Sequence, residues 1–222
     1  MIVKSVKMVN YKSIGDYENN IVIIEPNVTA IIGKNESGKS NVLDALAEID
    51  FIENKTSSYG QEKVNRNAQS PAKIEYIITL KPTPDEEESG IIGDTLITLS
   101  QGSYKIDGSL LEYYKIRIAP SIFVFASFLD DLGVNPFNLR DQELNRYRTY
   151  IATLKDIENV DVPKIKNALS FFKTKSAQLP DMHIKQLERA EQVFFSFLKI
   201  LPRFFLRRSE KHLKTTYKLE EI

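Results

Sequence analysis

The sequence predicts an α/β fold in which a mixed β-sheet surrounds a central helix and a helical subdomain follows. Near period-two alternation from Ile2 to Tyr11 predicts a half-exposed strand. The continuous apolar run Val28–Ile32, rich in β-branched residues, predicts a strand buried on both faces. Directly after a glycine-containing loop, residues 41–50 carry apolar side chains at helical spacing, which predicts a helix with one buried face.

The remaining elements follow in chain order. Short strands are expected at 21–24 and 72–80, and a hairpin at 95–99 and 104–106. Residues 113–118 and 121–125 resemble two further strands separated by Pro120. From about Leu139 the apolar spacing becomes helical, with helices expected over 142–157, 163–175 and 184–201 and a last strand at 203–207. We therefore expect a lobe over 1–138 that contains the loop, and a helical subdomain with a shortened C-terminal segment over 139–222.

Composition limits the kinds of chemistry available. Lysine plus arginine and aspartate plus glutamate each number 30 among the 222 residues, so no global charge attracts nucleic acid, and a DNA contact would need a local patch. The chain has no cysteine and two histidines, which excludes disulfides and thiolate chemistry and argues against a zinc site. No apolar run is long enough to span a membrane, so a cytoplasmic protein with no membrane contact is expected.

The segment Gly33-Lys-Asn-Glu-Ser-Gly-Lys-Ser40 fits the phosphate-binding pattern Gly-x-x-x-x-Gly-Lys-Ser/Thr at every fixed position. Glycines let successive backbone N–H groups point into one concavity, and the following helix adds the positive end of its dipole. Lys39 would meet the β- and γ-phosphates, and Ser40 would give its hydroxyl to Mg²⁺. The candidate phosphate-binding residues of the loop are Gly33, Lys34, Asn35, Glu36, Ser37, Gly38, Lys39 and Ser40. The pattern predicts a P-loop NTPase that binds Mg-ATP.

Two stretches carry a family resemblance. Residues 6–14, and residues 28–46 with Asn41 after the loop and Leu-Asp-Ala-Leu in the helix, resemble the amino-terminal lobe of the ABC-type chromosome-maintenance ATPases. These include the SMC and RecF proteins and, most similar, the AAA-labelled ATPases of OLD-family nucleases. In the resembled proteins a basic residue after the aromatic of the first strand lies near the nucleotide. The resemblance therefore implies Lys12 and Asn41 as further nucleotide-binding candidates.

The resemblance also implies what this chain would need to hydrolyse ATP. Such ATPases complete the site with a second lobe, which carries a Ser-Gly signature and a strand ending in Asp-Glu. No such signature follows the loop, so the chain resembles the first lobe alone. We expect a half-site that binds ATP, needs a second lobe or a homodimer partner for hydrolysis, and serves DNA processing, repair, phage defence or nuclease activity in the complete protein.

Two alternatives remain open at this stage. Residues 122–131 could form a strand ending at Asp130 and Asp131, which would hold Mg²⁺ and orient water in a self-contained kinase or small NTPase. The same aspartates could instead simply begin a helix. The chain could also be a non-hydrolysing module in which nucleotide only orders the fold. ATP is preferred over GTP because no Asn-Lys-x-Asp motif is present.

Other polar residues could either contact a ligand or simply be solvated surface residues. Lys12 is as well explained by a solvated strand lysine as by a phosphate contact. Arg66 is better explained by a solvated loop, and Gln101 by a hairpin turn, than by nucleotide sensing. The C-terminal basic residues could follow a phosphate backbone, although a charged strand edge explains them more simply. These residues are Arg203, Arg207, Arg208, Lys211 and Lys214.

Overall fold

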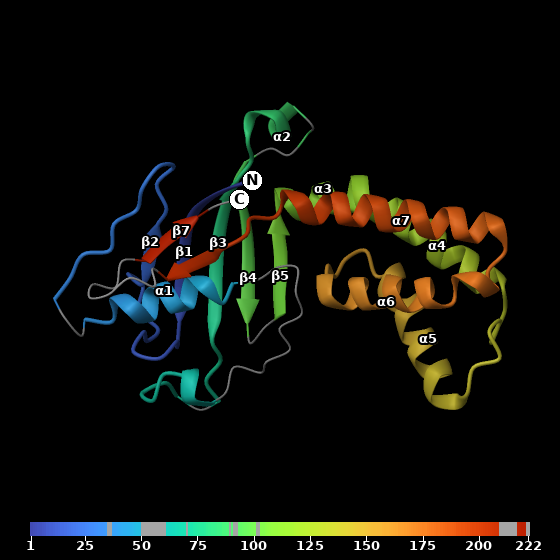
Figure 1. Cartoon of the computed structure of the whole chain (residues 1–222), viewed down its shortest axis with the longest axis horizontal. Coiled ribbons are helices and arrows are strands. Elements are labelled where there is room, and N and C mark those ends of the chain that lie inside the picture. The colour runs from blue at the N-terminus through green and yellow to red at the C-terminus, as the bar shows by residue number, and fades with distance from the viewer. Residues whose placement is uncertain are drawn as a thin grey trace. The chain divides into compact units, whose positions relative to one another are not determined.

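The computed structural model describes residues 1–34, 37–49, 61–69, 71–88, 90, 93–100, 103–208 and 217–220, with the backbone alone at 61, 103, 205–208 and 217–220. The chain divides into two compact units. One comprises Met1–Ser109 with Leu201–Ile222, and the other is Leu110–Ile200. The α/β class predicted from the sequence is confirmed, and the two units are described in turn (Figure 1). This division falls about thirty residues before the predicted boundary at 138/139.

A five-stranded sheet forms the first unit, in the order β2-β1-β3-β4-β5. Its strands are β1 (Ile2–Val9), β2 (Ile21–Ile23), β3 (Glu75–Lys81), β4 (Thr95–Ser100) and β5 (Ser103–Gly108). A separate pair joins β6 (Phe205–Arg208) to β7 (Tyr217–Glu220). Whereas the sequence predicted a mixed sheet, every pairing between the described strands is antiparallel.

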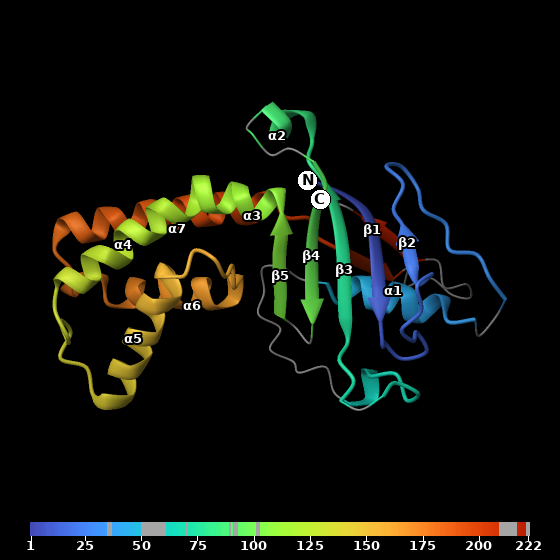
Figure 2. The same ribbon diagram turned by 180° about the vertical axis from the view of Figure 1, so that it is seen from behind.

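The helix α1 (Lys39–Ala47) lies on one face of this sheet, as the front and back views show together (Figures 1 and 2). Alternate side chains of the strands are buried, with Val6 on β1 and Ile78 on β3 fully enclosed. From the helical side Leu46 is fully buried, and Ile49 just beyond the helix is 2% exposed. Every second residue of the strands and one face of the helix therefore contribute side chains to the same core.

The predicted strand at Val28–Ile32 is wrong. The structure gives this segment no strand, and Val28 and Ile32 are 77% and 92% exposed. A strand exists only where a neighbour receives its backbone hydrogen bonds, and among the described strands none pairs with these residues. The apolar composition predicted burial on both faces, whereas Thr29 and Ile31 are only half-buried.

Helices make up the second unit. They are α3 (Ser109–Tyr113), η2 (Tyr114–Ile118), α4 (Ala119–Asp131), α5 (Asp141–Lys155), α6 (Val162–Thr174), η3 (Ser176–Gln178) and α7 (Asp181–Ile200). The helices predicted over 142–157, 163–175 and 184–201 are confirmed as α5, α6 and α7. The unit's core is aromatic, with Phe125 of α4 packing edge to face on Phe172 of α6 at 5.5 Å between ring centroids.

The strands predicted at 113–118 and 121–125 are wrong, because these residues form η2 and α4. Ile118, Ile122, Phe125 and Leu129 are buried, and their spacing of four, three and four is helical. Pro120 stands in the first turn of α4, directly after the π-helical turn η2, where its fixed φ fits the helix. A helix packed on both α5 and α7 buries these side chains better than a strand without neighbours.

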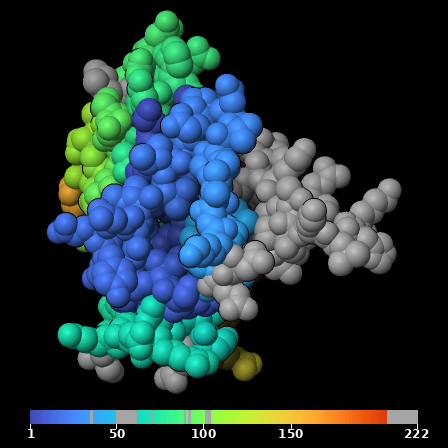
Figure 3. Space-filling view, turned by 90° about the vertical axis from the view of Figure 1, so that its left-hand side faces the viewer, coloured from blue at the N-terminus to red at the C-terminus, as the bar shows by residue number. Residues whose placement is uncertain are grey.

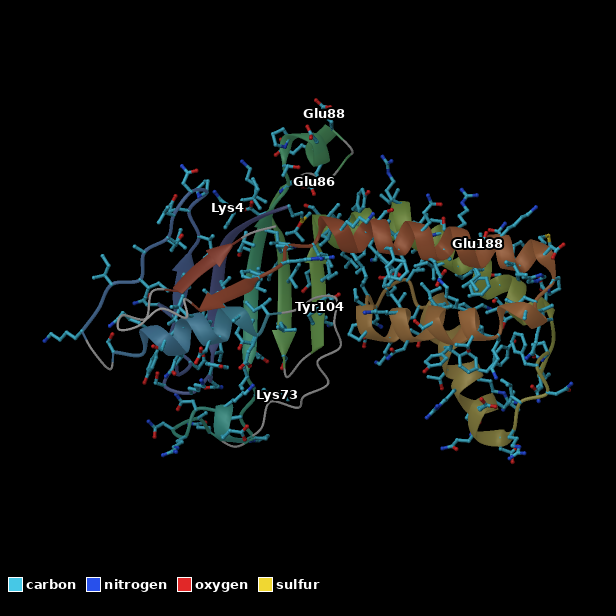
Figure 4. All side chains as sticks on the ribbon, viewed as in Figure 1. Lys4, Lys73, Glu86, Glu88, Tyr104 and Glu188 are labelled. Carbon is cyan, nitrogen blue, oxygen red and sulfur yellow. The ribbon has the colours of Figure 1, made fainter. Side chains whose placement is uncertain are left out.

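Two short helices lie in the connections of the sheet unit, η1 (Gln61–Lys63) and α2 (Pro84–Glu88). Glu86 of α2 accepts a hydrogen bond of 2.8 Å from the backbone ammonium of Met1 and two more from Thr83 (Figure 4). The hairpin predicted at 95–99 and 104–106 is confirmed as β4 and β5. Among the described helices, none has the length and apolar character needed to cross a membrane.

Candidate nucleotide-binding site

The loop that begins at Gly33 enters α1 through a backbone conformation that suits glycine. Gly38 precedes the helix with φ of 87°, in the left-handed region. A Cβ at Gly38 would lie 3.0 Å from the Ser13 hydroxyl oxygen, and one at Gly33 would lie 2.7 Å from that of Ser37. The backbone conformation therefore favours glycine at position 38, and a side chain at position 33 would displace the Ser37 hydroxyl. Asn35 and Glu36 lie outside the described residues.

The Lys39 side chain folds back over the loop. Its ammonium donates to the carbonyl oxygens of Gly33 at 2.7 Å and Lys34 at 2.5 Å, and lies 3.4 Å from the Ser37 hydroxyl. The Ser37 N–H also donates to the Lys34 carbonyl at 3.2 Å. The lysine thus holds its charge against the backbone carbonyls of the loop. Figure 3 shows the side of the sheet unit on which the connection between β2 and α1 lies.

The first turn of α1 is suited to an anion. Within the described part of the chain no side chain caps it, and the turn contains no acidic residue. Its first N–H groups therefore lack helical acceptors and carry the positive end of the dipole. Ser40, the metal-ligand candidate, is exposed in the same turn. Among the described residues, no group of three or more acidic or histidine side chains is arranged so that it could hold a metal ion.

A tight turn after β1, Tyr11-Lys12-Ser13, lies against this helix. Lys12 has φ of 47°, a conformation that costs a side-chain-bearing residue about 1–2 kcal/mol. Two bonds of 2.7 Å hold the turn, from the Lys12 N–H to the Lys63 carbonyl and from the Ile14 N–H to the Tyr11 carbonyl. A strained residue that is held this firmly indicates a function for its placement.

Three consecutive residues of this turn contact two residues of α1 and Glu48, the residue that caps the helix at its C-terminal end. Asn41 donates its amide to the Ser13 hydroxyl at 2.7 Å, and Lys12 donates its ammonium to the Asp44 carboxylate at 3.0 Å. The Tyr11 hydroxyl donates to the Glu48 carboxylate at 2.9 Å, which also pairs with Lys63. We call these three contacts the clamp; its partners on α1 and at the C-cap of α1 are Asn41, Asp44 and Glu48.

The clamp could have been found from the sequence only in part. Positions 41, 44 and 48 are spaced i, i+3 and i+7, so they share one face of the helix. That spacing indicates a polar face but does not say what lies against it. Asp44, Glu48 and Ser13 are therefore site residues that the sequence analysis missed.

Two hollows adjoin the loop and the turn. One of about 320 Å³ is bordered by Ser37, Gly38 and Val42 together with Ser13, Gly15 and Tyr17. A second of about 690 Å³ shares Ser13, Gly15 and Tyr17 and extends to the polar segment 65–75. The surface next to the loop is therefore recessed rather than flat.

Other candidates lie elsewhere. The strand expected to end at Asp130 and Asp131 is wrong, because both stand in the last turn of α4, where Asp130 pairs with Lys155. Arg66 and Arg203 are exposed, and Arg203 lies before β6 rather than in it. Gln101, Lys211 and Lys214, and the side chains of Arg207 and Arg208, lie outside the described residues.

These features define a class of protein: a loop whose backbone favours glycine, an uncapped helix start and a lysine over the loop are those of a P-loop nucleotide-binding protein. The chain belongs to the family of AAA ATPase domains, whose profile matches residues 1–218. It is also similar to "DNA replication and repair protein RecF" from three strains of Clostridium perfringens, 33% identical over 67 residues. That match covers 30% of this chain and 18% of each relative, so the chain corresponds to a small part of those proteins. No solved structure matches the chain.

Proposed function

We propose that this chain binds Mg-ATP through Gly33–Ser40 and Asn41, with Lys12 as a further phosphate contact, as the amino-terminal half-site of an OLD-, SMC- or RecF-like ATPase. The observation that supports it is the first turn of α1, which is uncapped within the described residues and stands beside the Lys39 ammonium. Phosphate oxygens would accept from the free N–H groups and from Lys39, which would release the carbonyls of Gly33 and Lys34.

Hydrolysis belongs to the complete protein in this proposal. Within the described residues, the first turn of α1 contains no acidic side chain that could orient the attacking water. A second lobe or a partner would supply those groups, and the nucleotide-dependent joining would serve DNA processing or nuclease action. The similarity to RecF, a DNA replication and repair protein by its name, supports the DNA link.

A calorimetric titration with Mg-ATP tests the binding. Loss of a charged hydrogen-bonding partner costs about 1.5–3 kcal/mol, so Lys39→Ala should weaken binding by about ten- to a hundredfold. Lys4→Ala, at an exposed lysine of β1, is the matched control and should bind as the wild type does (Figure 4). Equal affinity of the Lys39 variant and the wild type would overturn the proposal. Phosphate release by the chain alone would overturn the half-site part of it.

A further inference from the structure

We infer that Asp44 is a positioning residue that holds the Lys12 ammonium in reserve, and that the phosphates of ATP take Lys12 from Asp44 when they bind. This inference rests on the proposed function and deepens it. Of the three side chains that the turn contributes to the clamp, only that of Lys12 is long, flexible and charged. It lies between the shorter or more rigid side chains of Tyr11 and Ser13.

The backbone of Lys12 stays close to the phosphate loop whatever its side chain does. Its neighbour Ser13 reaches the neck of the loop, because a Cβ on Gly38 would lie 3.0 Å from the Ser13 hydroxyl. Tyr11, on the other side, is fully buried and bonded to Glu48. The two outer contacts of the clamp therefore fix the turn without help from the Lys12 side chain.

The distance to be covered is short. Asp44 is four residues after Ser40, which at 1.5 Å of rise per residue places it about 6 Å further along the helix axis. A lysine side chain has a four-carbon stem with free rotation, so a change of rotamer carries its ammonium over such a distance. From Asp44 the ammonium can thus move one helical turn toward the end of α1 where phosphates would lie.

The charges favour the exchange. The Lys12–Asp44 pair is partly solvated, with side chains 33% and 23% exposed, and such pairs are weak. Phosphate oxygens carry more negative charge than one carboxylate and form short, strong bonds to ammonium groups. Asp44 therefore competes with the nucleotide for Lys12, and the phosphates bind the ammonium more strongly. The Asp44 carboxylate thus lowers the affinity for ATP and does not contact the nucleotide itself.

A double-mutant cycle on the full 222-residue chain tests the exchange, with Mg-ATP affinity measured by calorimetry. Asp44→Asn frees Lys12 and should tighten binding about two- to fivefold, the strength of a partly exposed ion pair. Lys12→Met should weaken binding, and Asp44→Asn added to Lys12→Met should change nothing further. Glu18→Gln, which removes an exposed carboxylate from the β1–β2 connection, is the control for overall charge and should leave the affinity unchanged.

The outcomes separate the alternatives. Unchanged or weaker ATP binding by the Asp44→Asn variant would overturn the exchange and leave nucleotide binding standing. Equal tightening with and without Lys12 would also overturn it, since Asp44 would then act by general repulsion of phosphate. Absence of ATP binding by the wild type would overturn the proposed function itself, and the exchange with it. Unfolding curves without nucleotide confirm that each variant is folded.

Discussion

The replacement Gly38→Ala tests whether the neck of the loop is built as the structure indicates. Alanine at a φ of 87° costs about 1–2 kcal/mol through the left-handed backbone alone. The added Cβ would also stand 3.0 Å from the Ser13 hydroxyl, which is itself bonded to Asn41. Displacing that hydroxyl loses one hydrogen bond, about 1 kcal/mol more. The expected total is about 2–3 kcal/mol, together with weaker ATP binding.

A second glycine separates the two contributions. Gly133 has a similar φ of 95°, and a Cβ there would meet nothing within 4 Å. Gly133→Ala should therefore cost the backbone part alone, about 1–2 kcal/mol. Hydrogen exchange followed by peptide mass spectrometry is the suitable assay, because the two glycines lie in different units and each unit opens with its own free energy.

Removing the obstructing hydroxyl completes this test. In the Gly38→Ala background, Ser13→Ala should be less destabilising than in the wild type, because the clash disappears with the hydroxyl. The reasoning is refuted if Gly38→Ala costs no more than Gly133→Ala and Ser13→Ala brings no relief. It is refuted equally if Gly38→Ala leaves ATP affinity as it was.

Three further predictions concern other contacts. Tyr11→Phe removes a donor to the Glu48 carboxylate and should destabilise the sheet unit by about 1.5 kcal/mol in urea unfolding; an unchanged midpoint would contradict the clamp. Asp130→Asn removes only a solvated ion pair with Lys155, so stability should change by less than about 0.5 kcal/mol and ATP binding not at all. Burial, with a smaller contribution from a nearby aspartate, raises the pKa of Tyr114 above its usual 10.0, so the unfolded state loses this proton first. The helical unit should therefore lose stability as pH rises above about 10, and Tyr114→Phe should reduce that loss.

The sequence predicted best the elements whose signals are local. The hairpin of β4 and β5 combines strand alternation with a turn, and α5 to α7 have long helical periodicity. The backbone of the loop could also be anticipated, because the motif places a glycine where the structure has the left-handed conformation of Gly38. The fold of Lys39 over the loop carbonyls was not predicted. In each of the predicted cases the residues that determine the structure are neighbours in the chain.

Prediction failed for segments whose secondary structure is determined by contacts with residues far away in the sequence. Ile122–Phe125 is β-branched and aromatic, which favours a strand by propensity, yet contacts with α5 and α7 make it part of a helix. Val28–Ile32 has the composition of a buried strand but no described neighbour. Predicting the clamp would have required knowing which turn packs against the polar face of α1. A single sequence does not contain that information.

These differences bear on how the proposed half-site would be completed. One flank of the loop, α1, is fixed by its apolar core and by the clamp. The other flank, Val28–Ile32, is exposed and leads directly into Gly33. Burying a branched aliphatic side chain is worth about 1.5–3 kcal/mol, which the described residues leave ungained at Val28 and Ile32. A strand from a second lobe or a partner would gain it and fix this flank as well. Because coupling free energies are reciprocal, a partner that orders the loop from this side would raise ATP affinity, and ATP would raise the affinity for that partner by the same factor.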